Sequence, residues 1–129
     1  MKTILIVLMT FVSFGYANAQ STAIEGNWGY HQEINGIKFD MTFSISKNSV
    51  TVTNVCTGFG TSATAQVVVT SNYTENMLFI LESKQDEKSI GPLNCNVSAH
   101  QDVMNYSIQG SQLIFTHTGS PESFVLIRK

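Results

Sequence analysis

The sequence has little charge, two prolines and a single tryptophan. Charged residues make up 12% of the 129, and seven lysines and arginines against nine aspartates and glutamates give a formal net charge of −2 at pH 7. Without a basic patch, nucleic acid and a membrane surface are not expected partners. No segment carries apolar residues at helical spacing over ten or more positions, so a helical fold is also excluded.

Motifs for metal binding and catalysis are missing as well. His31, His100 and His117 lie on separate segments, and no pair of them has the spacing of a zinc site. No nucleophile-elbow motif is present, and a Ser-His-Asp triad is neither supported nor excluded. We therefore expect no catalytic residue, metal or cofactor, and a protein that is not an enzyme.

Residues 1–19 have the pattern of a secretory signal peptide. Lys2 supplies the positive charge, Ile4 to Phe14 is apolar, and Ala17-Asn18-Ala19 has the small residues that signal peptidase recognises. The apolar stretch is shorter than the ~20 residues that span a bilayer. We expect cleavage near Ala19, no membrane anchor, and a secreted or periplasmic protein of residues 20–129.

Both cysteines, Cys56 and Cys95, lie in the expected mature chain. An even count in an exported protein normally indicates a disulfide. Free thiols or pairing between molecules are the alternatives. A bridge would tie the polar connection Lys84 to Leu93 to the end of a preceding strand.

The clearest element is a strand from Ile37 to Ser46, in which apolar and polar residues alternate strictly. Asn35-Gly36, just before it, predicts a tight hairpin turn because both central residues of a type I′ turn need a positive φ. The apolar face of this strand consists of Ile37, Phe39, Met41, Phe43 and Ile45.

Seven further strands are predicted, and Asn96 to Asp102 is left unassigned. Eight short strands joined by turns indicate one all-β domain, an eight-stranded antiparallel up-and-down barrel, whose closure removes exposed sheet edges. The seven strands are Asn27–Ile34, Ser49–Cys56, Ser62–Ser71, Met77–Ser83, Val103–Ile108, Gln112–Thr118 and Ser123–Arg128.

Three features resemble the calycin superfamily, in particular small bacterial lipocalin-like barrels. Gly26-Asn27-Trp28 stands on the first strand, Arg128 on the last, and Tyr106 to Phe115 forms a strand-turn-strand unit. The resemblance implies that Arg128 packs over Trp28 and closes one end of the barrel. The chain departs from typical lipocalins because it is shorter and lacks their long helix, which weighs against a large cavity.

The inward faces of the strands are candidates for ligand contact. An eight-stranded barrel is wide enough to be filled by side chains or to hold one small ligand. Tyr106 would be the polar group of such a pocket, and a solid core built from the same residues is the alternative. The candidate ligand-binding residues are Phe39, Met41, Phe43, Phe79, Tyr106 and Phe115.

Our leading hypothesis is an exported, non-enzymatic lipocalin-like protein that binds a small apolar or amphipathic ligand. The alternative is a barrel that acts through its surface, such as a secreted protease inhibitor whose segment Gln20 to Glu25 enters a protease, or a structural envelope protein. Gly58-Phe59-Gly60 is expected to form a loop at the barrel mouth, with Phe59 as a contact residue.

Overall fold

The computed structural model describes residues 23–117 and 122–129, which form ten β-strands and no helix. The predicted signal peptide, its cleavage site and the turn at 119–121 lie outside the described residues. The strands are β1 (Gly26–Ile34), β2 (Ile37–Ile45), β3 (Ser49–Gly58), β4 (Thr61–Tyr73), β5 (Met77–Ile80), β6 (Lys84–Ile90), β7 (Leu93–Ala99), β8 (Asp102–Gln109), β9 (Gln112–Thr116) and β10 (Ser123–Arg128).

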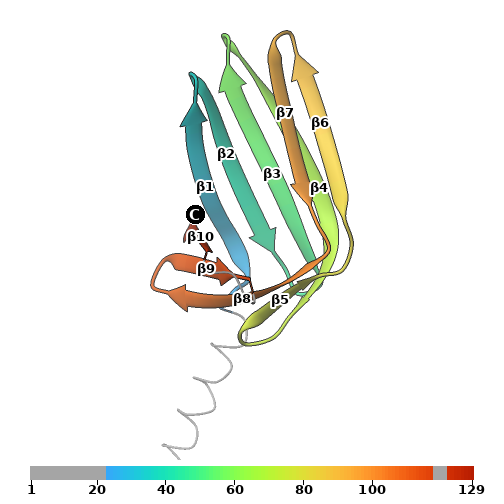
Figure 1. Cartoon of the computed structure of the whole chain (residues 1–129), viewed down its shortest axis with the longest axis vertical. Helices are drawn as coiled ribbons and strands as arrows, with labels where there is room; N and C mark the ends of the chain where they lie inside the picture. Colours follow the sequence, from blue (N-terminus) through green and yellow to red (C-terminus); the bar gives the residue numbers. More distant parts are fainter. Residues whose placement is uncertain (1–22, 118–121) are drawn as a thin grey trace, which may run out of the picture.

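Eight of these strands close into an antiparallel barrel, as the sequence predicts. Their order is β1-β10-β9-β8-β5-β4-β3-β2. Neighbours in the barrel follow one another along the chain except where β6 and β7 are inserted between β5 and β8 and where β1 pairs with β10 to close the ring. Four long strands, β1 to β4, rise side by side above the short strands β5, β8, β9 and β10 (Figure 1). The ring of strands is therefore complete at its lower end, and the long strands β1 to β4 continue above it on one side.

The insertion is a two-stranded hairpin, β6 and β7. The prediction that Lys84 to Leu93 is a polar connection was wrong, since Lys84 to Ile90 is a strand. Its residues are exposed on both faces, except for a half-buried Asp86. Such a strand leaves no apolar alternation in the sequence and is stabilised by pairing with β7, whose Leu93, Cys95 and Val97 are buried.

Local sequence explains the hairpin turns. Asn35 and Gly36 have φ values of 53° and 81°, as a type I′ turn requires. Phe59 and Gly60 repeat this geometry at 53° and 74°, so a tight turn replaces the predicted loop, and β3 and β4 run further than expected.

The disulfide Cys56–Cys95 is confirmed and fixes the hairpin to the barrel. It joins β3 to β7 with 5.7 Å between the Cα atoms. The Nδ2 group of Asn54, also on β3, donates to the carbonyl of Asn96 on β7 at 2.8 Å. Cys56 and Cys95 are fully buried, so the hairpin packs over the inner face of β3 and β4 rather than standing free.

Two carboxylates protect the edge of β4. The backbone N–H of Gln66 donates to Asp86 Oδ2 at 3.0 Å, and that of Thr70 donates to Glu82 Oε2 at 2.7 Å. These bonds hold the pKa of both carboxyl groups below the usual range; for Glu82 the hydroxyl of Thr70 contributes most. Acidic side chains therefore occupy donors that would otherwise invite another strand.

Trp28 closes the base of the barrel. Its indole is fully buried, and its Nε1 donates to the carbonyl of Ile24 at 2.8 Å. The guanidinium of Arg128 lies 4.0 Å from the ring centroid, in a cation–π contact, and donates to the carbonyl of Ala23 at 2.8 Å. The packing that the resemblance implies for Trp28 and Arg128 is present.

Tyr73 makes the base sensitive to alkaline pH. Its hydroxyl donates to Glu25, and burial followed by this hydrogen bond raises the pKa of Tyr73 to about 12. A raised pKa stabilises the fold below the unfolded-state value of about 10, and this contribution is lost as the pH rises toward 12. We expect the urea midpoint to fall less steeply across this range in Tyr73→Phe than in the wild type.

The control for this prediction is Tyr30→Phe, which removes a phenol that bonds to Gln32 instead of Glu25. Its urea midpoint should follow the wild type over the same range. Parallel curves for Tyr73→Phe and the wild type would contradict the role given to Tyr73.

Candidate functional site

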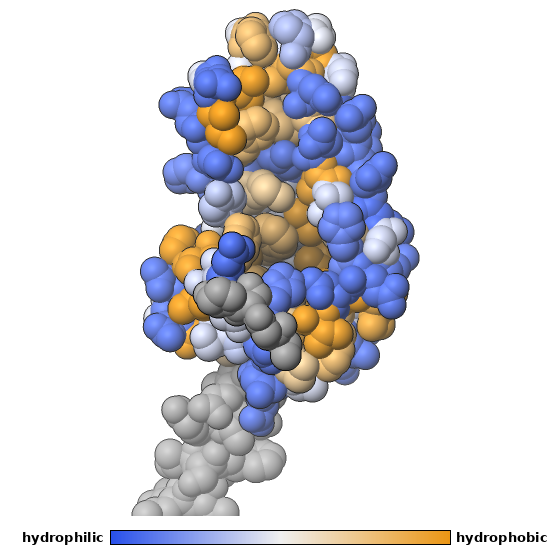
Figure 2. All heavy atoms as spheres, in the orientation of Figure 1, coloured by the Kyte–Doolittle hydropathy of each residue, from blue (hydrophilic) through white to orange (hydrophobic). Residues whose placement is uncertain are grey.

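The inner face of the barrel has a partly open cavity of about 420 Å³. Figure 2 shows a depression lined by apolar residues on this face of the molecule, with hydrophilic residues on both sides. The volume falls within the range of roughly 300–1,000 Å³ that small-molecule sites occupy. The lining residues are Phe43, Ile45, Val50, Val52, Val69, Leu78, Ile80, Ser98, Ala99, His100, Asp102, Met104, Phe115, His117, Glu122, Ser123 and Phe124.

The wall of the cavity is apolar and comes from most of the barrel. Alternation along β3 and β4 turns Val52 and Val69 inward, and both are buried. Phe115 reaches the cavity from β9 and Phe124 from β10. The rings of Phe43 and Phe124 are 6.3 Å apart between centroids, in an edge-to-face arrangement. Together these side chains offer a surface for an apolar or aromatic body.

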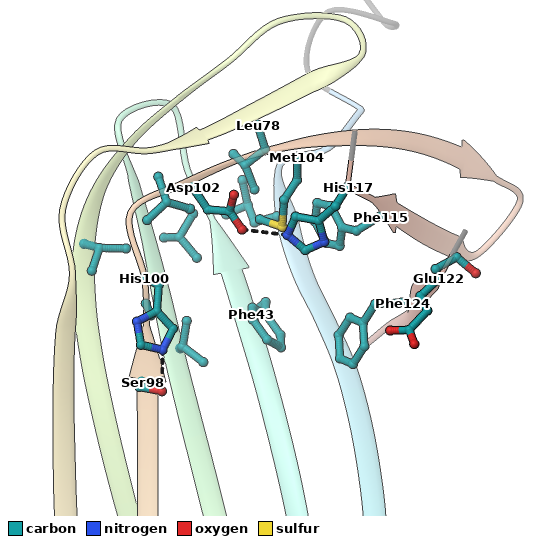
Figure 3. Close-up of a pocket in the computed structure, with 17 residues that line it drawn as sticks. Phe43, Leu78, Ser98, His100, Asp102, Met104, Phe115, His117, Glu122 and Phe124 are labelled. Carbon is teal, nitrogen blue, oxygen red and sulfur yellow. Dashed lines mark hydrogen bonds and ion pairs between the residues drawn. The ribbon is translucent and has the colours of Figure 1, made fainter. Parts of the chain in front are cut away.

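The polar lining residues include two histidines, each beside one partner, and Glu122 lies apart from them, next to Phe124 (Figure 3). His117 Nε2 lies 2.6 Å from Asp102 Oδ2, and His100 Nε2 lies 3.4 Å from Ser98 Oγ. Glu122, just ahead of β10, completes the set with Ser123. We call Ser98, His100, Asp102, His117, Glu122 and Ser123 the polar rim.

The polar rim contains serine, histidine and aspartate, the residue types of a catalytic triad, but their side chains are not connected as in a triad. A triad needs one histidine that contacts both the nucleophile and the acid. Here Ser98 contacts His100, whereas Asp102 contacts His117. Across residues 23–117 and 122–129, no group of three or more His, Cys, Asp or Glu side chains is placed to hold a metal ion.

No protein-family model, curated protein or solved structure matches this chain. The closed antiparallel barrel of eight strands is compatible with a calycin-like fold. The described part of the chain contains no helix that is long and apolar enough to cross a membrane.

Two of the six predicted ligand-binding residues, Phe43 and Phe115, line the cavity. Phe39 and Met41 share the inward face of β2 with Phe43 but lie further up the strand, where they pack half-buried against the core. Alternation in the sequence gives the face that these residues share and does not give their height in the barrel.

The other two predicted residues lie elsewhere. Phe79 is on the opposite face of β5 from Leu78 and Ile80, the two side chains of that strand that line the cavity. Tyr106 packs edge-to-face on Phe115 at 6.5 Å between centroids, and its hydroxyl donates to the carbonyl of Thr74. Burial, followed by the charge of Glu75, raises the pKa of Tyr106. Its hydroxyl is therefore engaged at the base and does not face the cavity.

Sequence reasoning missed Asp102, Met104, His117 and Phe124. Alternation carried backward from Tyr106 gives Met104 and Asp102, and carried forward from Phe115 gives His117. The signal was present, but the predicted strand began at Val103 and so excluded Asp102. The pairing of Asn105 with Thr116 then brings the two strands together in the register that joins Asp102 to His117.

The structure also describes Phe59 and part of the segment Gln20 to Glu25, the two surface features predicted from the sequence. Within the segment proposed to enter a protease, Ile24 is 1% exposed and its carbonyl is bound by Trp28, while residues 20–22 lie outside the described part. Phe59 is 64% exposed on the β3–β4 turn at the upper end of the long strands, away from the cavity (Figure 1). This turn lies at the end of the long strands opposite the closed base (Figure 1), and Phe59 is not among the residues that line the cavity.

Proposed function

We propose that this protein is an exported, non-enzymatic member of the calycin-like barrels that binds a small amphipathic molecule in its lumen. The observation that carries the proposal is the cavity of about 420 Å³, with an apolar wall and a few polar groups at one side. This combination is typical of small-molecule sites.

The chemistry of the rim favours binding over catalysis. Among residues 23–117 and 122–129, no contact that the structure gives joins the pair Asp102 and His117 to a nucleophile, and Ser98 is paired with the other histidine. Turnover would require these groups to be rearranged around a substrate.

Export is supported by two independent features. Residues 1–19 have the composition of a signal peptide, and the buried Cys56–Cys95 bridge is compatible with an oxidising compartment. A barrel that acts in the periplasm or outside the cell would carry or sequester its ligand there.

Filling the lumen with a larger side chain should strongly weaken ligand binding. Val69 is 1% exposed and lines the cavity, so in Val69→Phe the added ring occupies space that a ligand would use. We expect the neutral dye phenylnaphthylamine to bind the oxidised wild type saturably and to bind Val69→Phe roughly tenfold or more weakly. Fluorescence titration measures both affinities.

The matched control is Val68→Phe, which makes the same change on the neighbouring residue. The Val68 side chain is 46% exposed on the outer face of β4, so dye affinity should stay at the wild-type value. Thermal unfolding of both variants checks the fold, because overpacking costs about 1–3 kcal/mol. Equal dye affinity in the two variants, or no saturable binding to the wild type, would refute the lumen as the site.

A further inference from the structure

The carboxylates of the rim are its only side chains of fixed charge. Among the described residues that line the cavity, Asp102 and Glu122 are acidic, and none is a lysine or arginine. Of these two carboxylates, Asp102 lies 2.6 Å from His117.

An anionic head group would be disfavoured there. A carboxylate needs a cation or several donors when it leaves bulk water, and two carboxylates nearby would repel it. A cationic head group meets the opposite situation. It can contact Asp102 alongside His117. The carboxylate side chain of Asp102 is 38% exposed and is therefore reachable from solvent.

Aromatic side chains also line the cavity, on the side where Glu122 lies (Figure 3). Phe124 is 40% exposed beside the cavity and lies close to Phe43 and to Tyr30, with 5.1 Å between the ring centroids of Tyr30 and Phe124. The faces of aromatic rings attract cations. Phe124 also follows Glu122 by two residues, so that a ring and a carboxylate come from one short stretch of chain.

We infer that the ligand of this cavity is a hydrophobic amine, whose apolar body fills the lumen and whose ammonium group lies at the rim by Asp102. The inference rests on the proposed function, because it names the chemical class that the same cavity takes.

Decylamine, decanol and decanoate test the inference, since they share one alkyl chain and differ in head group. Their affinities for the oxidised protein are measured by displacement of phenylnaphthylamine at about pH 8, where free imidazole is neutral. We expect decylamine to bind most tightly and decanoate most weakly, with roughly a tenfold or larger difference between them. Asp102→Asn should bring decylamine close to decanol.

Glu33→Gln is the matched control, because it removes one negative charge from β1, opposite Lys38 and outside the cavity lining. It should keep the wild-type order of affinities.

The outcomes separate the inference from the proposed function. Equal affinities for the three ligands, or tightest binding of decanoate, would overturn the amine assignment and leave the lumen site standing. If neither the dye nor any of the three ligands binds, the proposed function fails as well. A decylamine preference that survives in Asp102→Asn would overturn the role given to Asp102.

Discussion

Replacing Cys56 and Cys95 together with alanine is expected to lower the free energy of unfolding by about 4 kcal/mol. The disulfide closes a loop with a sequence separation of 39, and removing it restores the conformational freedom of that loop in the unfolded chain. Urea denaturation of the oxidised wild type and the double variant measures the difference as a shift in midpoint. Wild type reduced with a thiol should behave like the double variant.

The same change should weaken binding of phenylnaphthylamine. β7 ends in Ser98 and Ala99, which line the cavity together with His100, and the disulfide is the covalent link that holds this hairpin on β3. A loss below about 1 kcal/mol with unchanged dye affinity would contradict the expectation. It would mean that the packing of Leu93 and Val97 is enough to hold the hairpin.

Trp28→Ala is the second substitution with a large expected effect, a loss of about 3–5 kcal/mol in the free energy of unfolding. The indole is fully buried, so its removal leaves a cavity at the base. The change also orphans the carbonyl of Ile24 and removes the ring under Arg128. Urea denaturation followed by circular dichroism measures the loss.

Trp28→Phe serves as the graded control. It keeps an aromatic ring for Arg128 while removing the hydrogen bond to Ile24, so it should lose less than Trp28→Ala. Equal stability of Trp28→Ala and the wild type would exclude Trp28 as the closing side chain. If Trp28→Ala does not fold, the loss in the free energy of unfolding of Trp28→Phe relative to the wild type still measures the contribution of the indole.

Local signals explain why most barrel strands could be predicted. The alternation of β2, the Asn35-Gly36 turn and the two cysteines each depend on neighbouring residues or on composition, and each is confirmed. β6 had no such signal, because a strand that is polar on both faces looks like a loop. It is recognisable only after its partner β7 is known.

The cavity was harder to predict because it depends on register between strands. Alternation assigned Phe39, Met41 and Phe43 to one face, but the pairing of neighbouring strands decides which of them reaches the hollow. The Asp102–His117 pair joins residues 15 positions apart through the pairing of β8 and β9. Phe79 was misplaced because the apolar run from Met77 to Leu81 has no alternation that reveals its inward face.

The order in which the barrel neighbours follow the chain has a consequence for folding. Most of the sheet can grow by adding each strand to the one just made, which keeps contacts local and fast to form. Closure is different, because β1 meets β10 and Arg128 bonds to a carbonyl 105 positions earlier. The long loop that this join closes makes it a late step. The lumen is complete only then, so the ligand that we propose for it would find its site only after the chain has folded.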